Sequence, residues 1–179
     1  MNDKEKMKIA FIGTHGTGKT TLGYELIAEL RKIGINANFV SETVRECPYE
    51  INENASKRAQ EWIIFNQCVK EIEEEARSEI VVCDRSVLDG YVYYVNRFGE
   101  NKMFEELVKE KIKEYDFIFR IPINPEMLKE DGIRSVNPKF QKDIDEKFDF
   151  LLNKLSINYF VTRDIKWILE KIENARRTI

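Results

Sequence analysis

Gly13-Thr-His-Gly-Thr-Gly-Lys-Thr20 matches the pattern G-x-x-x-x-G-K-[ST], and this match decides how the rest of the chain is interpreted. It lies between an apolar run, Lys8 to Gly13, and a segment from about Gly18 to Ile33 with a helical apolar stripe. Glycines let a main chain wrap closely around phosphate, so that successive N–H groups and the positive end of the helix dipole face the anion. We therefore expect a phosphate-binding turn between a strand and a helix.

The turn supplies the first candidate site residues. Lys19 is expected to neutralise the β- and γ-phosphates of a nucleotide, and Thr20 to hold Mg²⁺ through its hydroxyl, so ATP and Mg²⁺ are the predicted cofactors. His15 is the only histidine in the chain, but its place at an unrestricted position of the pattern favours a loop filler beside phosphate over a catalyst. The predicted nucleotide-binding residues are Gly13, Thr14, His15, Gly16, Thr17, Gly18, Lys19, Thr20 and Thr21.

Apolar runs of strand length alternate with longer segments of helical period, which predicts an α/β fold with a parallel sheet. A stripe of Ala59, Trp62, Ile63, Val69, Ile72 and Ala76 is expected to face the core. The 179 residues suffice for one core, so we expect a single domain over 1–179 with a lid at about 122–138. The other expected strands are Ala37 to Ser41, Ile80 to Cys83, Phe117 to Ile121 and Asn158 to Val161, and the other expected helices are Ala55 to Ala76, Phe140 to Leu155 and Ile165 to Ile172.

Charge and composition narrow the function classes. The net charge is −3, from 32 acidic and 29 basic residues, which argues against extended nucleic-acid binding. The chain has no signal-peptide pattern and no run near the roughly 18 apolar residues of a membrane span, so a cytoplasmic protein without a membrane partner is expected. The three cysteines form no C-x-x-C pair, which argues against disulfides and zinc. Homodimerisation is left open by the sequence.

Open parallel sheets bind their ligands beyond the carboxyl ends of the strands, and the third expected strand is followed by Asp84-Arg85-Ser86. Asp84 would order the Mg²⁺ water shell and accept a proton from an attacking hydroxyl. Arg85 would clamp the transferred phosphoryl group and contact the acceptor. The alternative is a strand end with a surface ion pair.

Other candidates for acceptor binding follow the second strand and lie on the next helix. Glu42 and Arg45 are expected at the same sheet edge, unless they only pair with each other. Gln67 has an amide that can read a base edge, whereas Trp62 fits core packing as well as stacking. Arg134, in the predicted lid, is expected to close over the phosphates, with a solvated loop arginine as the alternative.

Three short motifs together carry a family resemblance: V-x-E-x-x-R at Val40 to Arg45, D-R-S at Asp84 to Ser86, and D-G-x-R at Asp131 to Arg134. They resemble the NadR-like ATP-binding proteins, a group of P-loop kinases with an AAA-type ATP-binding domain that includes the nicotinamide riboside kinase domain. The D-R-S motif also resembles deoxynucleoside and thymidylate kinases. The resemblance implies a P-loop NTPase fold with a five-stranded parallel sheet of order 2-3-1-4-5.

By the same resemblance, the chain would transfer the γ-phosphoryl group of Mg·ATP to a hydroxyl or phosphate of a nucleoside- or nucleotide-like small molecule. The D-R-S motif departs from the riboside kinase pattern and leaves the acceptor open. Two other functions remain: a regulatory ATPase that acts through a partner, and a kinase that acts on a nucleic-acid hydroxyl. A GTPase switch fits poorly, because Asn153-Lys-Leu-Ser156 lacks the acid of N-K-x-D.

Overall fold

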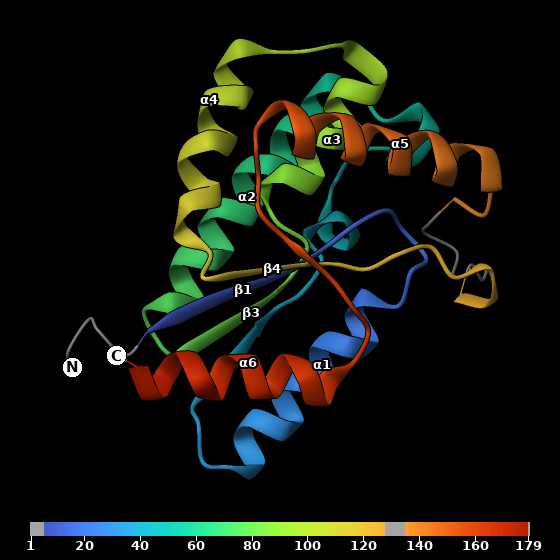
Figure 1. The fold of residues 1–179 in the computed structure, drawn as a ribbon. Helices are drawn as coiled ribbons and strands as arrows, with labels where there is room; N and C mark the ends of the chain where they lie inside the picture. Colours follow the sequence, from blue (N-terminus) through green and yellow to red (C-terminus); the bar gives the residue numbers. More distant parts are fainter. Residues whose placement is uncertain (1–5, 128–134, 179) are drawn as a thin grey trace.

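The computed structural model describes residues 6–127 and 135–178, and its strands form one parallel sheet in the order β2-β3-β1-β4-β5 (Figure 1). This confirms the predicted strand order and the predicted α/β fold class. The strands are β1 (Met7–Ile12), β2 (Ala37–Val40), β3 (Ile80–Asp84), β4 (Phe117–Arg120) and β5 (Phe160–Val161).

Helices cover both faces of the sheet. Helices α1 and α6 lie on one face, and the other four lie on the opposite face (Figure 1). None of the helices in the described residues combines the length and apolar character that a membrane span requires. The helices are α1 (Lys19–Lys32), α2 (Lys57–Glu75), α3 (Val87–Phe98), α4 (Lys102–Lys111), α5 (Pro138–Lys154) and α6 (Ile165–Thr178), and the 3₁₀ turns are η2 (Thr43–Glu46), η3 (Asn52–Asn54), η4 (Ile112–Glu114) and η5 (Pro125–Met127).

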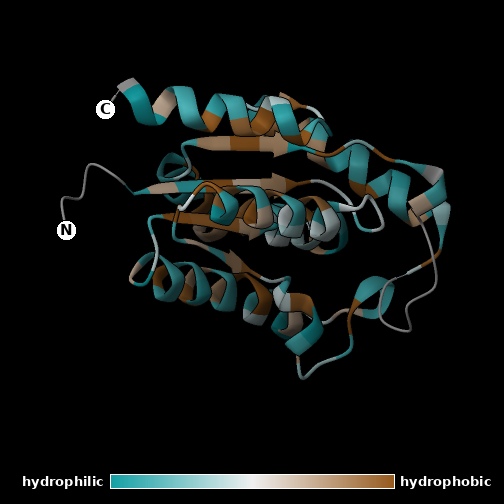
Figure 2. Ribbon diagram, turned by 90° about the horizontal axis from the view of Figure 1, so that it is seen from below, coloured by the Kyte–Doolittle hydropathy of each residue, from teal (hydrophilic) through white to brown (hydrophobic). Residues whose placement is uncertain are grey.

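Alternating strand residues feed two hydrophobic cores, one on each face of the sheet. In β1, Ile9 and Phe11 pack with α1 and α6, whereas Ala10 and Ile12 pack with the helices of the other face. Figure 2 shows the apolar strands in the middle of the molecule and hydrophilic residues on the outward sides of the helices. Burial on both faces explains why the central strands are unbroken apolar runs in the sequence.

The predicted apolar stripe of helix α2 is correct at Ala59 and Ile63, which are buried, and fails further along the helix. Val69 and Ile72 are 51% and 55% exposed, so their assignment to the core was wrong. The buried side instead carries three polar residues, Gln60, Gln67 and Glu71. When buried positions of a helix are polar, the hydrophobic pattern of its sequence predicts the wrong core-facing side.

Helix α3 was not predicted, and its burial gives the reason. Eight of its residues are buried, and six of these are consecutive, from Val87 to Val92, so no exposed side marks the first half of the helix. Gly90 lies where α3 crosses α2, and a Cβ atom there would lie 2.7 Å from Ile64 Cγ1. The close approach of these two helices thus requires a glycine.

Substitution Gly90→Ala should lower the free energy of unfolding by about 1–3 kcal/mol, because the added methyl group overpacks this crossing. Urea denaturation measures the change. In an Ile64→Ala background the same substitution should cost far less, since the clashing Cγ1 is gone. Equal costs in both backgrounds would show that Ile64 is not the obstacle.

Candidate functional site

The turn between β1 and α1 has the backbone that its glycines predict. Gly13, Gly16 and Gly18 have φ values of 133°, 63° and 84°, which residues with side chains rarely adopt. At Gly13 a Cβ atom would also lie 2.8 Å from the carbonyl oxygen of Ile121, the residue that follows β4. The turn is therefore packed against the end of the neighbouring strand.

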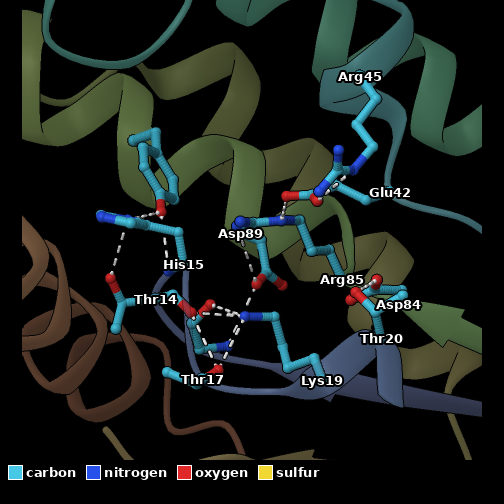
Figure 3. A network of polar contacts seen from close by, with 12 residues as sticks. Thr14, His15, Thr17, Lys19, Thr20, Glu42, Arg45, Asp84, Arg85 and Asp89 are labelled. Atoms are coloured by element: carbon cyan, nitrogen blue, oxygen red, sulfur yellow. Dashed lines mark hydrogen bonds and ion pairs between the residues drawn. The ribbon is translucent and has the colours of Figure 1, made fainter. Parts of the chain in front are cut away.

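The Lys19 ammonium group points into this turn (Figure 3). It donates to the carbonyl oxygens of Gly13 and Thr14 at 2.8 and 2.5 Å, and to Thr17 Oγ1 at 3.2 Å. Burial, reinforced by the positive charge of Arg85, lowers the pKa of Lys19 to about 7. An anion bound in the turn would favour the charged form and raise this pKa.

Thr20 and Asp84 meet at the carboxyl edge of the sheet. Thr20 Oγ1 donates to Asp84 Oδ2 at 2.5 Å (Figure 3), and β-sheet pairing sets Asp84 beside Phe11 of β1. Burial and the negative charge of Glu42 raise the pKa of Asp84. A hydroxyl and a carboxylate oxygen are the hard ligands that Mg²⁺ prefers, so this pair fits the expected cation.

Within the described ranges, no cluster of three or more His, Cys, Asp or Glu side chains suits a metal ion. Mg²⁺ commonly takes one or two protein oxygens and completes its shell with water and phosphate. The Thr20–Asp84 pair is consistent with this coordination.

Arg85 is buried at the start of the segment after β3, and two carboxylates surround its guanidinium group. Its Nε donates to Glu42 Oε1 at 2.6 Å, and its Nη1 lies 3.8 Å from Asp89 Oδ1. The ring of Tyr93 lies 5.3 Å from the guanidinium carbon. Burial alone would lower the pKa of Arg85, but Glu42, Tyr93 and Asp89 outweigh it and raise that pKa well above the usual value.

The structure brings Glu42 and Arg85 together at the sheet edge, as the sequence predicted. Arg45 is placed at the rim, with a side chain that is 40% exposed and an Nε atom 3.6 Å from Glu42 Oε2. The ion pairing that the sequence left as an alternative is thus present at both arginines. Burial of Glu42 and Arg85 distinguishes this cluster from a surface pair.

A narrow cavity of about 30 Å³ lies beside the Arg85 cluster and adjoins a wider one of about 320 Å³. The wider cavity falls at the small end of the roughly 300–1,000 Å³ typical of ligand pockets. Gln60, Asn52 and Tyr93 line both cavities. The narrow cavity is also lined by His15, Glu42, Val44, Ile51, Ile63, Arg85, Asp89 and Gly90, and the wider one by Glu53, Asn96, Arg97 and Phe140.

Gln67 does not line either cavity, which does not fit its expected contact with an acceptor. Its Nε2 donates to Glu71 Oε1 at 2.8 Å and to the main-chain oxygen of Arg85 at 3.2 Å, so both amide hydrogens are used inside the protein. Gln60 lies two helical turns earlier on the same buried face and reaches the cavities instead. The helix was predicted correctly, but the glutamine was not.

Asp89 was missed in the sequence, although Ser86-Val-Leu-Asp89 has capping-box spacing. Asp89 Oδ2 accepts from the main-chain nitrogen and the hydroxyl of Ser86 at 2.8 and 2.9 Å. Its Oδ1 accepts from the main-chain nitrogen of Gly13 at 3.2 Å. One buried carboxylate therefore joins the start of α3 to the phosphate-binding turn.

Two further contacts fix the tip of the turn. The Tyr93 hydroxyl accepts from the His15 main-chain nitrogen at 3.1 Å and lies 2.8 Å from His15 Nδ1. Gln141 of α5 donates to the His15 carbonyl oxygen at 2.7 Å. His15 is thus a buried part of the turn, which agrees with the loop-filler interpretation.

Arg163, from the segment between β5 and α6, was also missed. Its Nη2 donates to the carbonyl oxygens of Thr17 and Pro122 at 2.7 and 2.6 Å. No short motif marks this arginine, because its neighbours in space lie far away in the sequence. It ties the turn to the segment after β4.

The predicted lid is covered only in part, and Arg134 lies outside the described residues. Its flank at Ser135 donates to Glu53 Oε1 at 2.6 Å. Because Glu53 lines the wider cavity, this flank lies at the cavity's edge.

A parallel sheet of order 2-3-1-4-5, with a glycine turn between its central strand and the first helix and a Thr–Asp pair beside that turn, defines a P-loop NTPase fold. Residues 8–167 match the family model described as an AAA domain, and the chain belongs to this family. No curated protein sequence matches it.

Solved structures of similar fold include two kinases. The deoxyadenosine kinase from M. mycoides with bound products is 18% identical, with a TM-score of 0.64 over 97% of this chain and 100% of that one. The thymidylate kinase from Ehrlichia chaffeensis is 20% identical, with a TM-score of 0.68 over 93% of this chain and 98% of that one. At these identities the comparison establishes a shared fold.

Substitution Asp89→Asn should lower the free energy of unfolding by about 1.5–3 kcal/mol, because a charged acceptor of several buried hydrogen bonds is lost. Denaturant titration measures the cost. Ser86→Ala is the matched control: it removes one donor to the same carboxylate and should cost only about 0.5–1.5 kcal/mol. A smaller effect for Asp89→Asn than for Ser86→Ala would contradict the assigned role.

Proposed function

We propose that this protein is an ATP-dependent kinase that transfers the γ-phosphoryl group of Mg·ATP to a hydroxyl of a nucleoside-like small molecule. One observation carries the proposal: the phosphate-binding turn and the Thr20–Asp84 pair lie at the same sheet edge as the narrow cavity lined by Glu42 and Arg85, which continues into the wider cavity of about 320 Å³. Places for a donor and an acceptor thus adjoin. The deoxyadenosine kinase of similar fold has also been solved with bound dATP, which supports this assignment.

On the donor side, the main-chain N–H groups of residues 13–21 and the Lys19 ammonium would hold the triphosphate. Thr20 and Asp84 would hold Mg²⁺, which when bound offsets the charge of the phosphate oxygens. Arg134 remains a proposed phosphate contact. Arg163 lies next to Gly18, where a Cβ atom would be 3.5 Å from its Nη1, so it borders the donor side.

On the acceptor side, charge favours a nucleoside over a nucleoside monophosphate. Arg85 is already paired with Glu42 and Asp89, so the narrow cavity has two carboxylates against one guanidinium. A phosphate placed in the narrow cavity would add negative charge where the one guanidinium group is already paired. The finer resemblance to NadR-like proteins stays part of this proposal.

Gln60 is the residue we assign to the edge of the acceptor's base. It is 4% exposed and lines both cavities, and within the described part of the chain its side-chain amide makes no hydrogen bond. Because Gln60 lines both cavities, its amide can pair with a ligand that supplies a donor and an acceptor. Arg45 and Glu53 would contact the outer part of the acceptor.

Proton transfer divides the roles of the two carboxylates. Glu42 lines the narrow cavity, whereas Asp84 does not line it and is bonded to Thr20. We therefore assign Glu42 to accept the proton of the acceptor hydroxyl and Asp84 to order Mg²⁺, in place of the double role expected of Asp84. Arg85 would stabilise charge on the transferred group.

The adjoining cavity also bears on the two alternative functions. A regulatory ATPase that acts through a partner needs no small buried cavity beside its phosphate turn, and a nucleic-acid kinase needs an open approach for a strand. The enclosed Gln60 position fits a small acceptor better than either of them.

The direct test is incubation with Mg·ATP and a panel of nucleosides and nucleoside monophosphates, followed by chromatographic detection of products. A phosphorylated nucleoside is expected. ATP hydrolysis that no acceptor stimulates, or a partner-dependent increase in hydrolysis, would count against the proposal.

Substitutions at the two carboxylates should have different signatures. Asp84→Asn should leave ATP binding nearly unchanged, lower turnover roughly 10²-fold or more, and raise the Mg²⁺ concentration needed for half-maximal rate. Glu42→Gln should lower turnover on a similar scale without changing the Mg²⁺ requirement. Steady-state rates over a Mg²⁺ titration separate them. Full activity of Asp84→Asn, or an unchanged Mg²⁺ requirement, would refute the metal role.

Nucleotide affinity should fall as the pH rises above about 7. The free Lys19 has a pKa of about 7, so at higher pH binding must bring a proton to its amine. The loss approaches tenfold per pH unit between about pH 7.5 and about pH 9.5, where the nucleotide's own phosphates no longer titrate. Calorimetry in buffers of different ionisation enthalpy measures the proton uptake. Lys19→Ala should bind more weakly and lose the pH dependence, together with most turnover.

A further inference from the structure

Arg85 has an unfavourable main-chain conformation, and hydrogen bonds hold the residue in it. Its φ of 88° lies in the left-handed region, where a residue with a side chain is strained. Three hydrogen bonds restrain it: its main-chain nitrogen donates to Phe11 O at 3.0 Å, its carbonyl oxygen accepts from Gln67 Nε2 at 3.2 Å, and its Nε donates to Glu42 at 2.6 Å. The Arg85 carbonyl oxygen is thus held by a side chain, that of Gln67.

Gln67 is itself held from behind by Glu71, one helical turn further along α2. The second Gln67 amide hydrogen goes to Glu71 Oε1 at 2.8 Å, and the Tyr115 hydroxyl donates to the same oxygen at 2.6 Å. Glu71 Oε2 lies 3.4 Å from Lys8 Nζ. The amide of Gln67 therefore has one orientation that satisfies both of its acceptors.

This line of contacts runs from the reacting edge of the sheet into the core. Gln67, Glu71 and Lys8 are 2%, 1% and 5% exposed. Polar groups cost free energy at such depth unless every partner is present, and apolar side chains of similar size are often as stable. A connected line of buried hydrogen bonds gains rigidity in return.

We infer that Gln67 is a positioning residue for phosphoryl transfer, which acts by holding the main chain of Arg85 so that the guanidinium group faces the cavity and the phosphate turn. The inference rests on the proposed kinase function. Gln67 touches neither cavity, so it works through Arg85 alone. Glu71 fixes its amide, and Lys8 offsets the charge of Glu71.

The test compares Gln67→Leu with Tyr115→Phe, which removes a hydrogen bond to the same Glu71 oxygen but leaves the Gln67–Arg85 contact. Both should lower the melting temperature. Gln67→Leu should lower kcat about tenfold or more with little change in the KM for ATP, because small displacements of a charged clamp cost rate. Tyr115→Phe should keep kcat within about twofold of wild type.

A double substitution shows whether the effect passes through Arg85. In an Arg85→Ala background, Gln67→Leu should cause no further loss of the residual kcat. An additional loss of the same size, or an unchanged kcat for Gln67→Leu alone, would overturn the inference.

If wild-type protein phosphorylates no acceptor, the proposed function fails, whereas active wild type with active Gln67→Leu defeats only this inference. Gln67→Asn keeps the amide but cannot span both acceptors, and it should show the same loss of kcat. If both Gln67 variants unfold without a cooperative melting transition, whereas Tyr115→Phe keeps one, Gln67 is a purely structural residue and the inference is wrong.

Discussion

A buried guanidinium group must be neutralised, and at Arg85 this requirement organises the carboxyl edge of the sheet. Glu42 comes from the end of β2 and Asp89 from the first turn of α3, and both approach the same positive charge. Asp89 also accepts from the Gly13 main chain, so the charge balance extends to the phosphate-binding turn. Breaking one member of such a buried set leaves an uncompensated charge, which is far more costly than losing a surface pair. The proposed donor and acceptor sides of the site thus share one set of buried charges.

The sequence predicts the sheet well because each central strand is buried on both faces and reads as an apolar run. It predicts α1 and α5 because their core-facing stripes are apolar. It fails at α3, where six consecutive residues are buried, and at α2, where Gln60, Gln67 and Glu71 occupy the buried face and Val69 and Ile72 face outward. Polar residues are buried in a core because of their tertiary contacts. A hydrophobic pattern in the sequence does not contain those contacts, so it cannot predict which polar residues are buried.

The candidate site divides in the same way. Strand order brings the carboxyl ends of β1, β2 and β3 to one edge, so it was predictable that Lys19, Thr20, Asp84, Glu42 and Arg85 lie there, while their roles stay a prediction. The choice between Gln60 and Gln67 was not, since residues seven apart lie on the same face of a helix and only the depth of the neighbouring cavity separates them. Arg163 and Gln141 contact the turn from distant parts of the chain without any local motif.

The turn that holds Lys19 has a consequence for which anions it can accept. The ammonium group already has three oxygen partners within the protein, so an incoming ligand gains little from simple attraction. The ligand must replace the oxygens of the turn around the Lys19 ammonium group with oxygens of its own. A polyphosphate tail would offer several oxygens on adjacent phosphorus atoms, whereas a lone carboxylate would offer two and chloride none. Selectivity for polyphosphates over small anions would then depend on how many oxygen partners of Lys19 the ligand replaces, and it would not require a metal ion or an acceptor.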